Sequence, residues 1–294
     1  MSQATGTAGI LAQVVEETIT ERNTPDRERE KYIHPSSLAR GCMLYIAREL
    51  MGLPKPLLDP RVSRILEVGI ERHRRIPYYF SKVTLAREVF FVDEEYRIRG
   101  YCDALIYISP ERDPDLAGFY AVELKTTGAS EFERIVDEAQ PKEEHVRQCQ
   151  VYMWGIERYY QHIIPLQGGI IFYENRDTLE HGLFNVSYDE EMMDQLLAQI
   201  EALWGRVREG QLPEDHLPLD HWAHRYCPYL DICEVGQQAI AYQKEHRQPL
   251  PDKVLAQMIG KRIVRKQRRE GQDKARKQSR GRSLEELVAE FDWK

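Results

Sequence analysis

Two short segments of the chain combine charged residues with apolar neighbours in the pattern of a β-strand. Residues 100–108 read Gly-Tyr-Cys-Asp-Ala-Leu-Ile-Tyr-Ile, and residues 120–127 read Tyr-Ala-Val-Glu-Leu-Lys-Thr-Thr. Asp103 and Glu123 therefore lie where burial of a charge without a partner would be costly. Lys125 follows Glu123 by two residues and points to the same face of its strand. An Asp, a Glu and a Lys on adjacent strands are the side chains used to cleave phosphodiesters with a divalent metal ion.

These side chains match the preferences of a hard divalent cation. Mg²⁺ takes oxygen ligands, usually one or two carboxylates with waters and phosphate oxygens, so Asp103 and Glu123 are the expected ligands. A metal ion held there would lower the pKa of a bound water and polarise a phosphate. Lys125 would orient the water or offset developing charge. Leu124 points the other way into the core, which leaves its backbone carbonyl as a further ligand.

The Glu-x-Lys triplet alone is weak support for a metal site. The chain has 48 acidic and 41 basic residues, and such triplets usually lie on solvated surfaces. Two further motifs add to it. A helix expected over about 59–80 carries Gly69 and His73, and a later helix carries Gln148 and Tyr152, which share one face at a spacing of four. In chain order the motifs are G-x-x-x-H, G-x-x-D, E-x-K and Q-x-x-x-Y.

This order of motifs resembles the RecB-like exonuclease branch of the PD-(D/E)xK nuclease superfamily, which includes nuclease domains of recombination helicases and CRISPR-adaptation exonucleases. The resemblance covers about residues 32–235. It implies an α/β fold with a mixed central β-sheet flanked by helices, a restriction-endonuclease-like core, and helical N- and C-terminal elements. It also implies that Mg²⁺ or Mn²⁺ is bound by His73, Asp103, Glu123 and the carbonyl of Leu124, that the catalytic residues are Asp103, Glu123 and Lys125, and that Gln148 and Tyr152 contact the DNA backbone.

Some of these residues also have plainer explanations. A lone histidine on a helix is more often a surface or core residue than a ligand. The interpretation of His73 as a metal ligand therefore depends on the other motifs that follow it in the expected order. Tyr152 is equally consistent with an aromatic residue packed on the sheet. Glu88, in a strand expected over 85–92, is either an extra acid near the site or an ordinary exposed strand residue.

Three cysteines and one histidine suggest a second site. One large subgroup of the RecB-like nucleases binds an iron–sulfur cluster through an N-terminal Cys and a C-terminal group spaced near C-x-x-C-x5-C. The matching positions here are Cys42, His224, Cys227 and Cys233, with His224 where the pattern has a Cys. Three interpretations stay open: an iron–sulfur site with one His ligand, a structural Zn²⁺ site, or a remnant held by packing. A metal there would be structural.

The charge of the chain is unevenly distributed. The whole sequence sums to −7, but residues 253–282 hold 12 Lys and Arg residues and two acids. Such a segment is either a phosphate-contacting arm or a solvated tail. The expected DNA contacts within it are Lys261, Arg262, Arg265, Lys266, Arg268 and Arg269. The amphipathic segment 283–291 that follows would dock on a protein partner or fold back on the basic run.

Hydrophobic periodicity and turn residues predict the order of elements. Helices are expected over about 9–22, 36–51, 59–80, 130–138, 142–160 and 189–208, and strands over 85–92, 97–108, 118–125, 167–174 and 180–187. Residues 32–240 are expected to form the nuclease domain, between an N-terminal helix and charged loop (1–31) and a basic helical extension (241–294).

The composition of the chain indicates the cellular compartment in which it is expected. No run approaches the ~20 apolar residues of a membrane span, and the first nine residues lack the features of a secretory signal. A cytoplasmic protein without membrane contact is expected, with its five cysteines reduced or metal-bound. The predicted function is a metal-dependent DNA exonuclease acting on single strands or ends in recombination, repair or replication. The alternatives are an inactive DNA-binding or partner-loading module and a structure-specific (flap) endonuclease.

Overall fold

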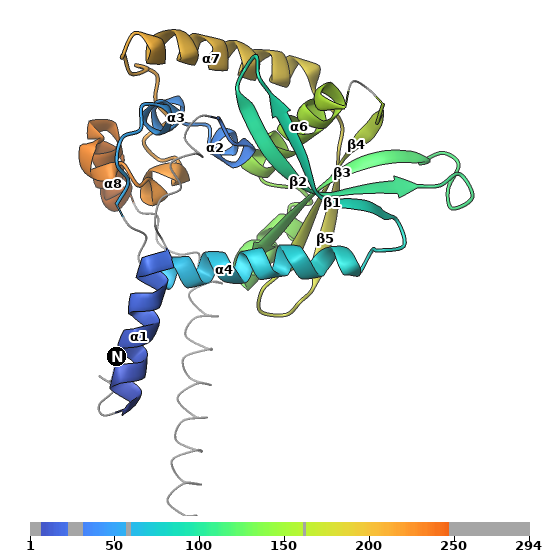
Figure 1. Cartoon of the computed structure of the whole chain (residues 1–294), viewed down its shortest axis with the longest axis horizontal. Coiled ribbons are helices and arrows are strands. Elements are labelled where there is room, and N and C mark those ends of the chain that lie inside the picture. Colours follow the sequence, from blue (N-terminus) through green and yellow to red (C-terminus); the bar gives the residue numbers. More distant parts are fainter. Residues whose placement is uncertain (1–6, 23–31, 57–59, 161–162, 247–294) are drawn as a thin grey trace, which may run out of the picture. The chain divides into compact units, whose positions relative to one another are not determined.

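The computed structural model describes residues 7–22, 32–56, 60–160 and 163–246 (Figure 1). Its helices are α1 (Thr7–Arg22), α2 (Pro35–Ala39), α3 (Met43–Leu50), α4 (Pro60–Arg75), α5 (Ala129–Asp137), α6 (Glu143–Tyr159), α7 (Glu190–Arg208) and α8 (Glu234–Glu245). Its strands are β1 (Thr84–Asp93), β2 (Ile98–Ile108), β3 (Gly118–Thr127), β4 (Leu166–Asn175) and β5 (His181–Val186). None of the described helices is long and apolar enough to cross a membrane.

The five strands form one sheet in the order β1-β2-β3-β4-β5. The pairs β1–β2, β2–β3 and β4–β5 are antiparallel, whereas β3 and β4 run parallel. A parallel pair needs a long crossover, and α5 and α6 supply it. The predicted mixed α/β sheet flanked by helices is confirmed.

Alternate residues of β3 belong to two separate apolar clusters, so both faces of the sheet are covered. Ala121 belongs to the larger cluster, which includes Cys149 of α6. Leu124 belongs to the smaller cluster, with Ile76 of the 3₁₀ turn (Ile76–Tyr78) that follows α4. Side chains of a strand alternate between faces, so α6 covers one face, while the opposite face packs against the turn that follows α4.

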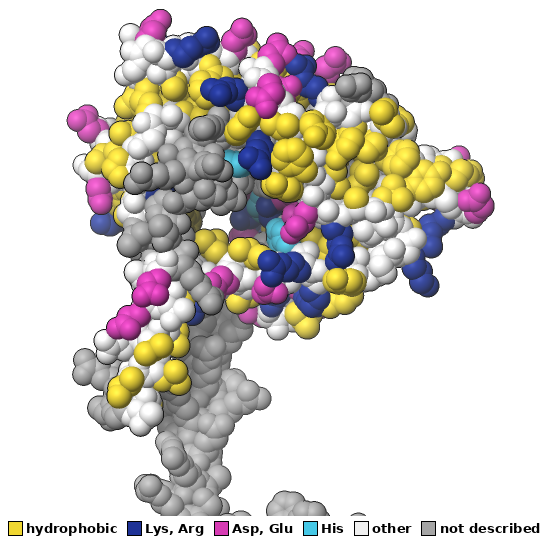
Figure 2. Space-filling view, in the orientation of Figure 1, with side chains coloured by type: hydrophobic (Ala, Val, Ile, Leu, Met, Phe, Trp, Pro, Cys, Tyr) yellow, Lys and Arg dark blue, Asp and Glu magenta, His cyan; other side chains and the backbone are white. Residues whose placement is uncertain are grey.

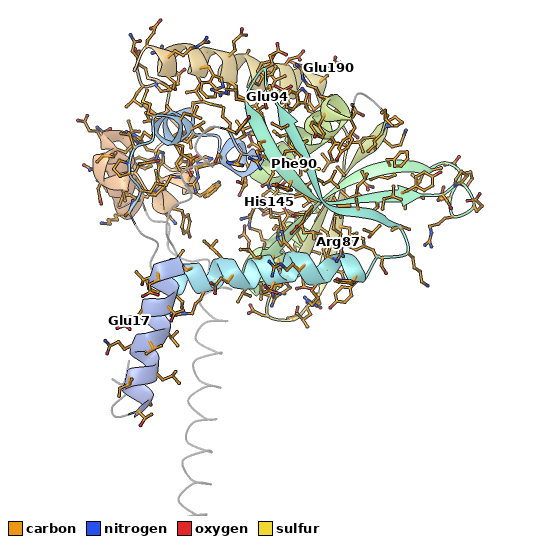
Figure 3. The ribbon with its side chains drawn as sticks, viewed as in Figure 1. Glu17, Arg87, Phe90, Glu94, His145 and Glu190 are labelled. Carbon is orange, nitrogen blue, oxygen red and sulfur yellow. The ribbon has the colours of Figure 1, made fainter. Side chains whose placement is uncertain are left out.

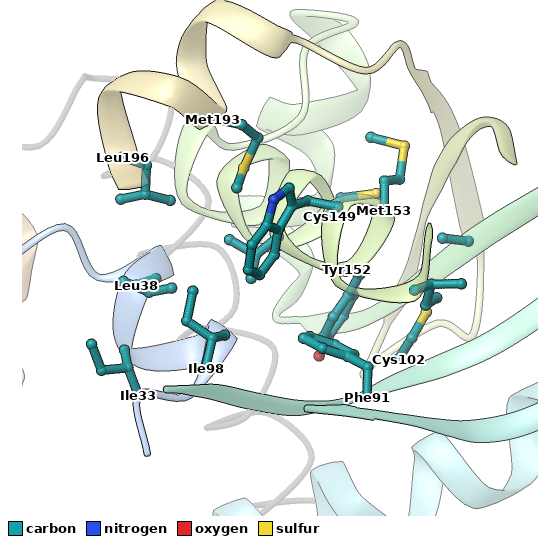
Figure 4. Packing of buried hydrophobic residues seen from close by; sticks show 14 of the residues in the cluster. Ile33, Leu38, Phe91, Ile98, Cys102, Cys149, Tyr152, Met153, Met193 and Leu196 are labelled. Atoms are coloured by element: carbon teal, nitrogen blue, oxygen red, sulfur yellow. The ribbon is translucent and has the colours of Figure 1, made fainter. Parts of the chain in front are cut away.

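Helix α6 packs unusually close to the sheet. Figure 4 shows its side chains directly over Phe91 and Cys102. A Cβ atom at Gly155 of α6 would lie 2.2 Å from the Phe91 ring, and one at Gly169 of β4 would lie 2.3 Å from the sulfur of Cys149. Glycine at both positions permits this approach.

The sheet opens between β2 and β3. These strands pair only from Ile108–Gly118 to Ala104–Val122. Beyond that point β2 stays with β1 and β3 stays with β4. We call this opening the fork. It begins at Asp103 of β2, the first residue past the last pair.

One expected helix is wrong. The segment 36–51 is not continuous but forms α2 and α3. Gly41 between them has a φ of +75°, and a Cβ there would lie 2.6 Å from Nη1 of Arg147. Glycine adopts this left-handed conformation readily, so the chain turns there and Cys42 becomes the residue that begins α3. The other expected elements agree within a few residues, except that α4 ends at Arg75, two residues before a proline that cannot continue it.

Candidate active site

The fork brings His73 and Asp103 together. Nδ1 of His73 in α4 lies 3.1 Å from Oδ1 of Asp103, and the backbone N–H of Leu124 donates a hydrogen bond to Oδ2 of Asp103 over 2.7 Å. Both carboxylate oxygens of Asp103 are therefore engaged. The side chain is held in one orientation between α4 and β3.

These contacts also set the charge of the pair. Burial acts to raise the pKa of Asp103, but the hydrogen bond and charge of His73, with the charge of Lys125, hold it below its usual value. Burial acts to lower the pKa of His73, and the hydrogen bond and charge of Asp103 outweigh it and raise that pKa. Asp103 is thus an ionised carboxylate at neutral pH.

Glu123 is the most deeply buried acid of the site. Its side chain is 0% exposed, its Oε1 forms an ion pair with Lys125, and its Oε2 has no hydrogen-bond partner among the described residues. Burial raises its pKa to about 8 although the charge of Lys125 opposes the shift. A carboxylate so placed is costly to ionise unless a cation compensates its charge.

Lys125 is held between Glu123 and α6. Its ammonium donates a hydrogen bond to Oε1 of Gln148 over 3.1 Å, and Nε2 of Gln148 donates to the hydroxyl of Tyr152 over 2.8 Å. This second bond confirms that Gln148 and Tyr152 share one face of a helix. Both are buried, and their contact with DNA stays a prediction. Burial acts to lower the pKa of Lys125, but the charges of Glu123 and Asp103 outweigh it and raise that pKa.

An acid that the sequence analysis missed ties α4 to the sheet. Glu174 of β4 is 3% exposed, and it accepts hydrogen bonds of 2.7 Å from Arg72 and from Arg75. These arginines flank His73. The available signal was an acid within the apolar run of β4, the same signal that identified Glu123. Glu174 therefore fixes the helix that presents His73.

A second missed residue is His145 of α6. Its Nδ1 lies 2.7 Å from the hydroxyl of Tyr173. Burial, together with the charges of Lys125 and Lys142, lowers the pKa of His145 to about 2, so the ring is neutral at working pH. Figure 2 shows histidine, basic and acidic side chains gathered in a hollow beside α4, and Figure 3 labels His145 in the same part of the view.

The four residues of the second predicted site line one cavity of about 20 Å³: Cys42, His224, Cys227 and Cys233. Arg40 and Arg48 line it too. Nε2 of His224 lies 3.0 Å from the carbonyl oxygen of Pro218, which leaves Nδ1 as its other donor atom. Within the described part of the chain, no three His, Cys, Asp or Glu side chains have the spacing of a formed metal site, at this cavity or at the fork.

The remaining predicted features are Glu88 and two C-terminal segments. Glu88 is exposed in β1, with a φ of +50°. The basic segment 253–282 and the amphipathic segment 283–291 lie outside the described residues, so their predicted contacts stay predictions.

Comparisons with known proteins were made by sequence and by structure. The model of the PD-(D/E)XK nuclease superfamily matches residues 9–234. A search of curated proteins finds no match. Among solved structures, SSO0001 has a TM-score of 0.46 at 18% identity, covering 79% of this chain and 99% of its own. An alkaline exonuclease from Laribacter hongkongensis has a TM-score of 0.45 at 12% identity, covering 66% and 93%, and its complex with dAMP has 0.47 at 12%, covering 63% and 91%. Because the family model extends over most of the sequence and includes every strand of the forked sheet, the chain belongs to the PD-(D/E)XK nuclease superfamily.

Proposed function

We propose that this chain is a Mg²⁺- or Mn²⁺-dependent DNA exonuclease of the RecB-like branch, acting on single strands or DNA ends. The observation that carries the proposal is the fully buried carboxylate of Glu123, whose Oε1 pairs with Lys125 and whose Oε2 has no hydrogen-bond partner among the described residues. Ionising such a group requires a compensating charge. Lys125 supplies one, and the nearby carboxylate of Asp103 adds a second negative charge. Two carboxylates and one ammonium leave negative charge for a divalent cation to balance.

The residues present fit such a cation. His73, Asp103, Glu123 and the carbonyl of Leu124 would hold it. His73 contacts Asp103 through Nδ1, and histidine ligands commonly use one ring nitrogen in this way while the other faces the metal. A divalent cation bound there would polarise the scissile phosphate and acidify a bound water.

Lys125 acts as a charge and a hydrogen-bond donor. Because the charges of Glu123 and Asp103 raise its pKa, it keeps its proton at neutral pH and cannot serve as the base. Gln148 holds the ammonium from the side of α6. In this position Lys125 orients the attacking water and offsets negative charge that develops on the phosphate.

The test uses linear DNA labelled at either end, single- and double-stranded, with Mg²⁺ or Mn²⁺, and a circular DNA of each kind. We expect the linear DNA to be degraded from its ends and the circles to stay intact. Asp103→Asn should be inactive, whereas Asp194→Asn, on the exposed face of α7, should behave as wild type. Cleavage of circles would indicate an endonuclease. Binding without cleavage of any DNA would indicate the inactive module.

We also propose a structural metal at the cavity lined by Cys42, His224, Cys227 and Cys233. The donor set suits iron–sulfur with one His ligand or a tetrahedral zinc site. Four protein ligands would leave no open coordination position, so its role would be to join α3 to the segment before α8. The corresponding domain, by this proposal, is 32–240, with the basic residues after 253 as an additional DNA-binding arm.

A further inference from the structure

Three aromatic rings, one each from the edge strand β1, from β2 and from α6, lie together, and the chemistry proposed above does not use them. The centroid of the Phe90 ring is 5.2 Å from that of Tyr101 and 5.6 Å from that of Tyr159. Tyr101 is 51% exposed and Tyr159 is 41% exposed. Large exposed rings grouped in this way mark interaction sites more often than a single exposed ring does.

The rings are held in place by α6. The hydroxyl of Tyr160 donates a hydrogen bond to the backbone carbonyl of Phe90 over 3.2 Å. The ring of Tyr160 also packs edge-on against Tyr159, with centroids 5.0 Å apart. A ligand that stacks on this surface would therefore meet side chains that are already ordered by their neighbours.

Arginines accompany the rings. The guanidinium of Arg99 lies 5.3 Å from the centroid of Phe90, and that of Arg87, on the same strand as Phe90, lies 4.5 Å from the centroid of Tyr78, a ring outside this group. Within the described part of the chain, no acidic side chain forms an ion pair with Arg99 or Arg87. Their donors are thus available to an anionic ligand. Figure 3 labels Phe90 and Arg87 in the part of the view where His145 is also labelled.

This surface adjoins the fork. Tyr101 precedes Asp103 by two residues in β2, which places their Cα atoms about 7 Å apart. Phe90 is the register partner of Tyr101 on β1. A polynucleotide whose backbone reached Asp103 would carry its neighbouring bases over these rings.

We infer that Phe90, Arg99, Tyr101 and Tyr159, here called the β1 platform, bind the bases and phosphates of a single-stranded DNA next to the cleavage site. The inference rests on the proposed nuclease function and specifies the form of its substrate. Aromatic rings beside arginines bind single strands because each unpaired base has a face free to stack, whereas the bases of a duplex are stacked on one another. The platform therefore favours a strand that has been separated from its complement.

The experiment measures DNA binding by the full chain and by its Tyr101→Ala, Tyr101→Phe and Arg99→Gln variants. Ca²⁺ replaces Mg²⁺ in the binding buffer, and each labelled DNA is checked afterwards to be uncleaved. The probes are short oligo(dT), an abasic strand of equal length, and a hairpin duplex. Tyr188→Ala, at another exposed tyrosine that makes none of the platform's ring contacts, is the matched control. We expect Tyr101→Ala to weaken oligo(dT) binding about tenfold and to leave abasic and duplex binding unchanged. Tyr101→Phe should bind as wild type. Arg99→Gln should weaken both single strands and reduce the salt dependence of binding.

Two results would overturn the inference. One is unchanged oligo(dT) affinity in Tyr101→Ala. The other is an equal loss on oligo(dT) and the abasic strand, because the ring would then support the fold and not the bases. Failure of the nuclease proposal would give a different result from failure of the platform inference. In that case wild-type protein would bind oligo(dT) through the platform but would cleave no DNA in Mg²⁺ or Mn²⁺. If the wild-type protein cleaves DNA and Tyr101→Ala binds oligo(dT) with unaltered affinity, the nuclease proposal stands and the platform inference is rejected.

Discussion

The carboxylate of Asp103 accepts a hydrogen bond from the backbone N–H of Leu124, 2.7 Å away, at the point where β2 and β3 separate. Past the Ala104–Val122 pair, β2 no longer pairs with β3, so the side chain provides the acceptor that this N–H requires. Asp103 therefore joins the two strands in addition to carrying charge. Its structural and chemical roles can be separated by the choice of substitution.

Asp103→Asn keeps an acceptor for Leu124 and removes the charge. We expect cleavage to fall by about a hundredfold or more, with little change in the free energy of unfolding. Asp103→Ala should lose activity equally and should also be destabilised by about 1–3 kcal/mol, because the N–H is left unpaired. Rates on saturating DNA and denaturant unfolding measure the two effects. Near-wild-type rates in Asp103→Asn would remove this carboxylate from the mechanism.

Glu123 should make the stability of the metal-free protein depend on pH. Its folded-state pKa is raised from 4.5 to about 8, so the folded state binds more protons than the unfolded state between these values. Stability from this group is present below about pH 4.5 and is lost as the pH rises through 8, with a slope of at most about 1.4 kcal/mol per pH unit. Denaturant unfolding in EDTA at several pH values measures it. Glu123→Gln should flatten the slope, and identical slopes in the two proteins would contradict the shift.

Glu174 should be important for stability because two arginines depend on it. Glu174→Ala removes the buried acceptor of Arg72 and Arg75, and because both arginines are partly exposed and keep other hydrogen-bond partners, the expected cost is about 1–3 kcal/mol. Glu201→Ala, at an exposed position on α7, serves as the control and should change little. Equal unfolding free energies for the two variants would show that α4 does not rely on this contact.

The charged residues of the fork could be predicted from the sequence, whereas the residues that hold them in place could not. Asp103 and Glu123 could be found because a charged residue in an apolar strand contradicts its neighbours. Glu174 gives the same signal, but its partners lie about 100 residues away in another helix, and no local pattern shows that pairing. The break at Gly41 was missed for a similar reason, since the space there is limited by Arg147 of α6.

The basic arm can be tested by truncation before Lys253. If the segment 253–282 contacts phosphates, the truncated protein should bind DNA more weakly and show a flatter slope of log affinity against log salt concentration. Turnover of saturating substrate should change little. Binding measured across a salt series tests this, and an unaltered slope would mean that the arm does not contact DNA.

Cys227→Ser should lower stability before it affects chemistry. Loss of one ligand would release the structural metal, so the protein should melt earlier and lose activity in proportion to its folded fraction. Visible absorbance of anaerobically purified wild-type protein would identify iron–sulfur, and a colourless protein with stoichiometric zinc would identify the alternative. Metal analysis that finds neither iron nor zinc would leave these cysteines as packing residues.

The separation in sequence between the partners at each site has a consequence for the order of folding. Asp103 and Glu123 meet through strands that adjoin in sequence, whereas the cavity joins Cys42 to Cys233, about 190 residues further on. Contacts between distant segments close a larger loop and form later. During synthesis, the fork can assemble before the C-terminal wall of the cavity has left the ribosome. We therefore expect pulse-labelling hydrogen exchange to protect β2 and β3 early and the segment 224–233 last, so that closing the cavity completes the fold.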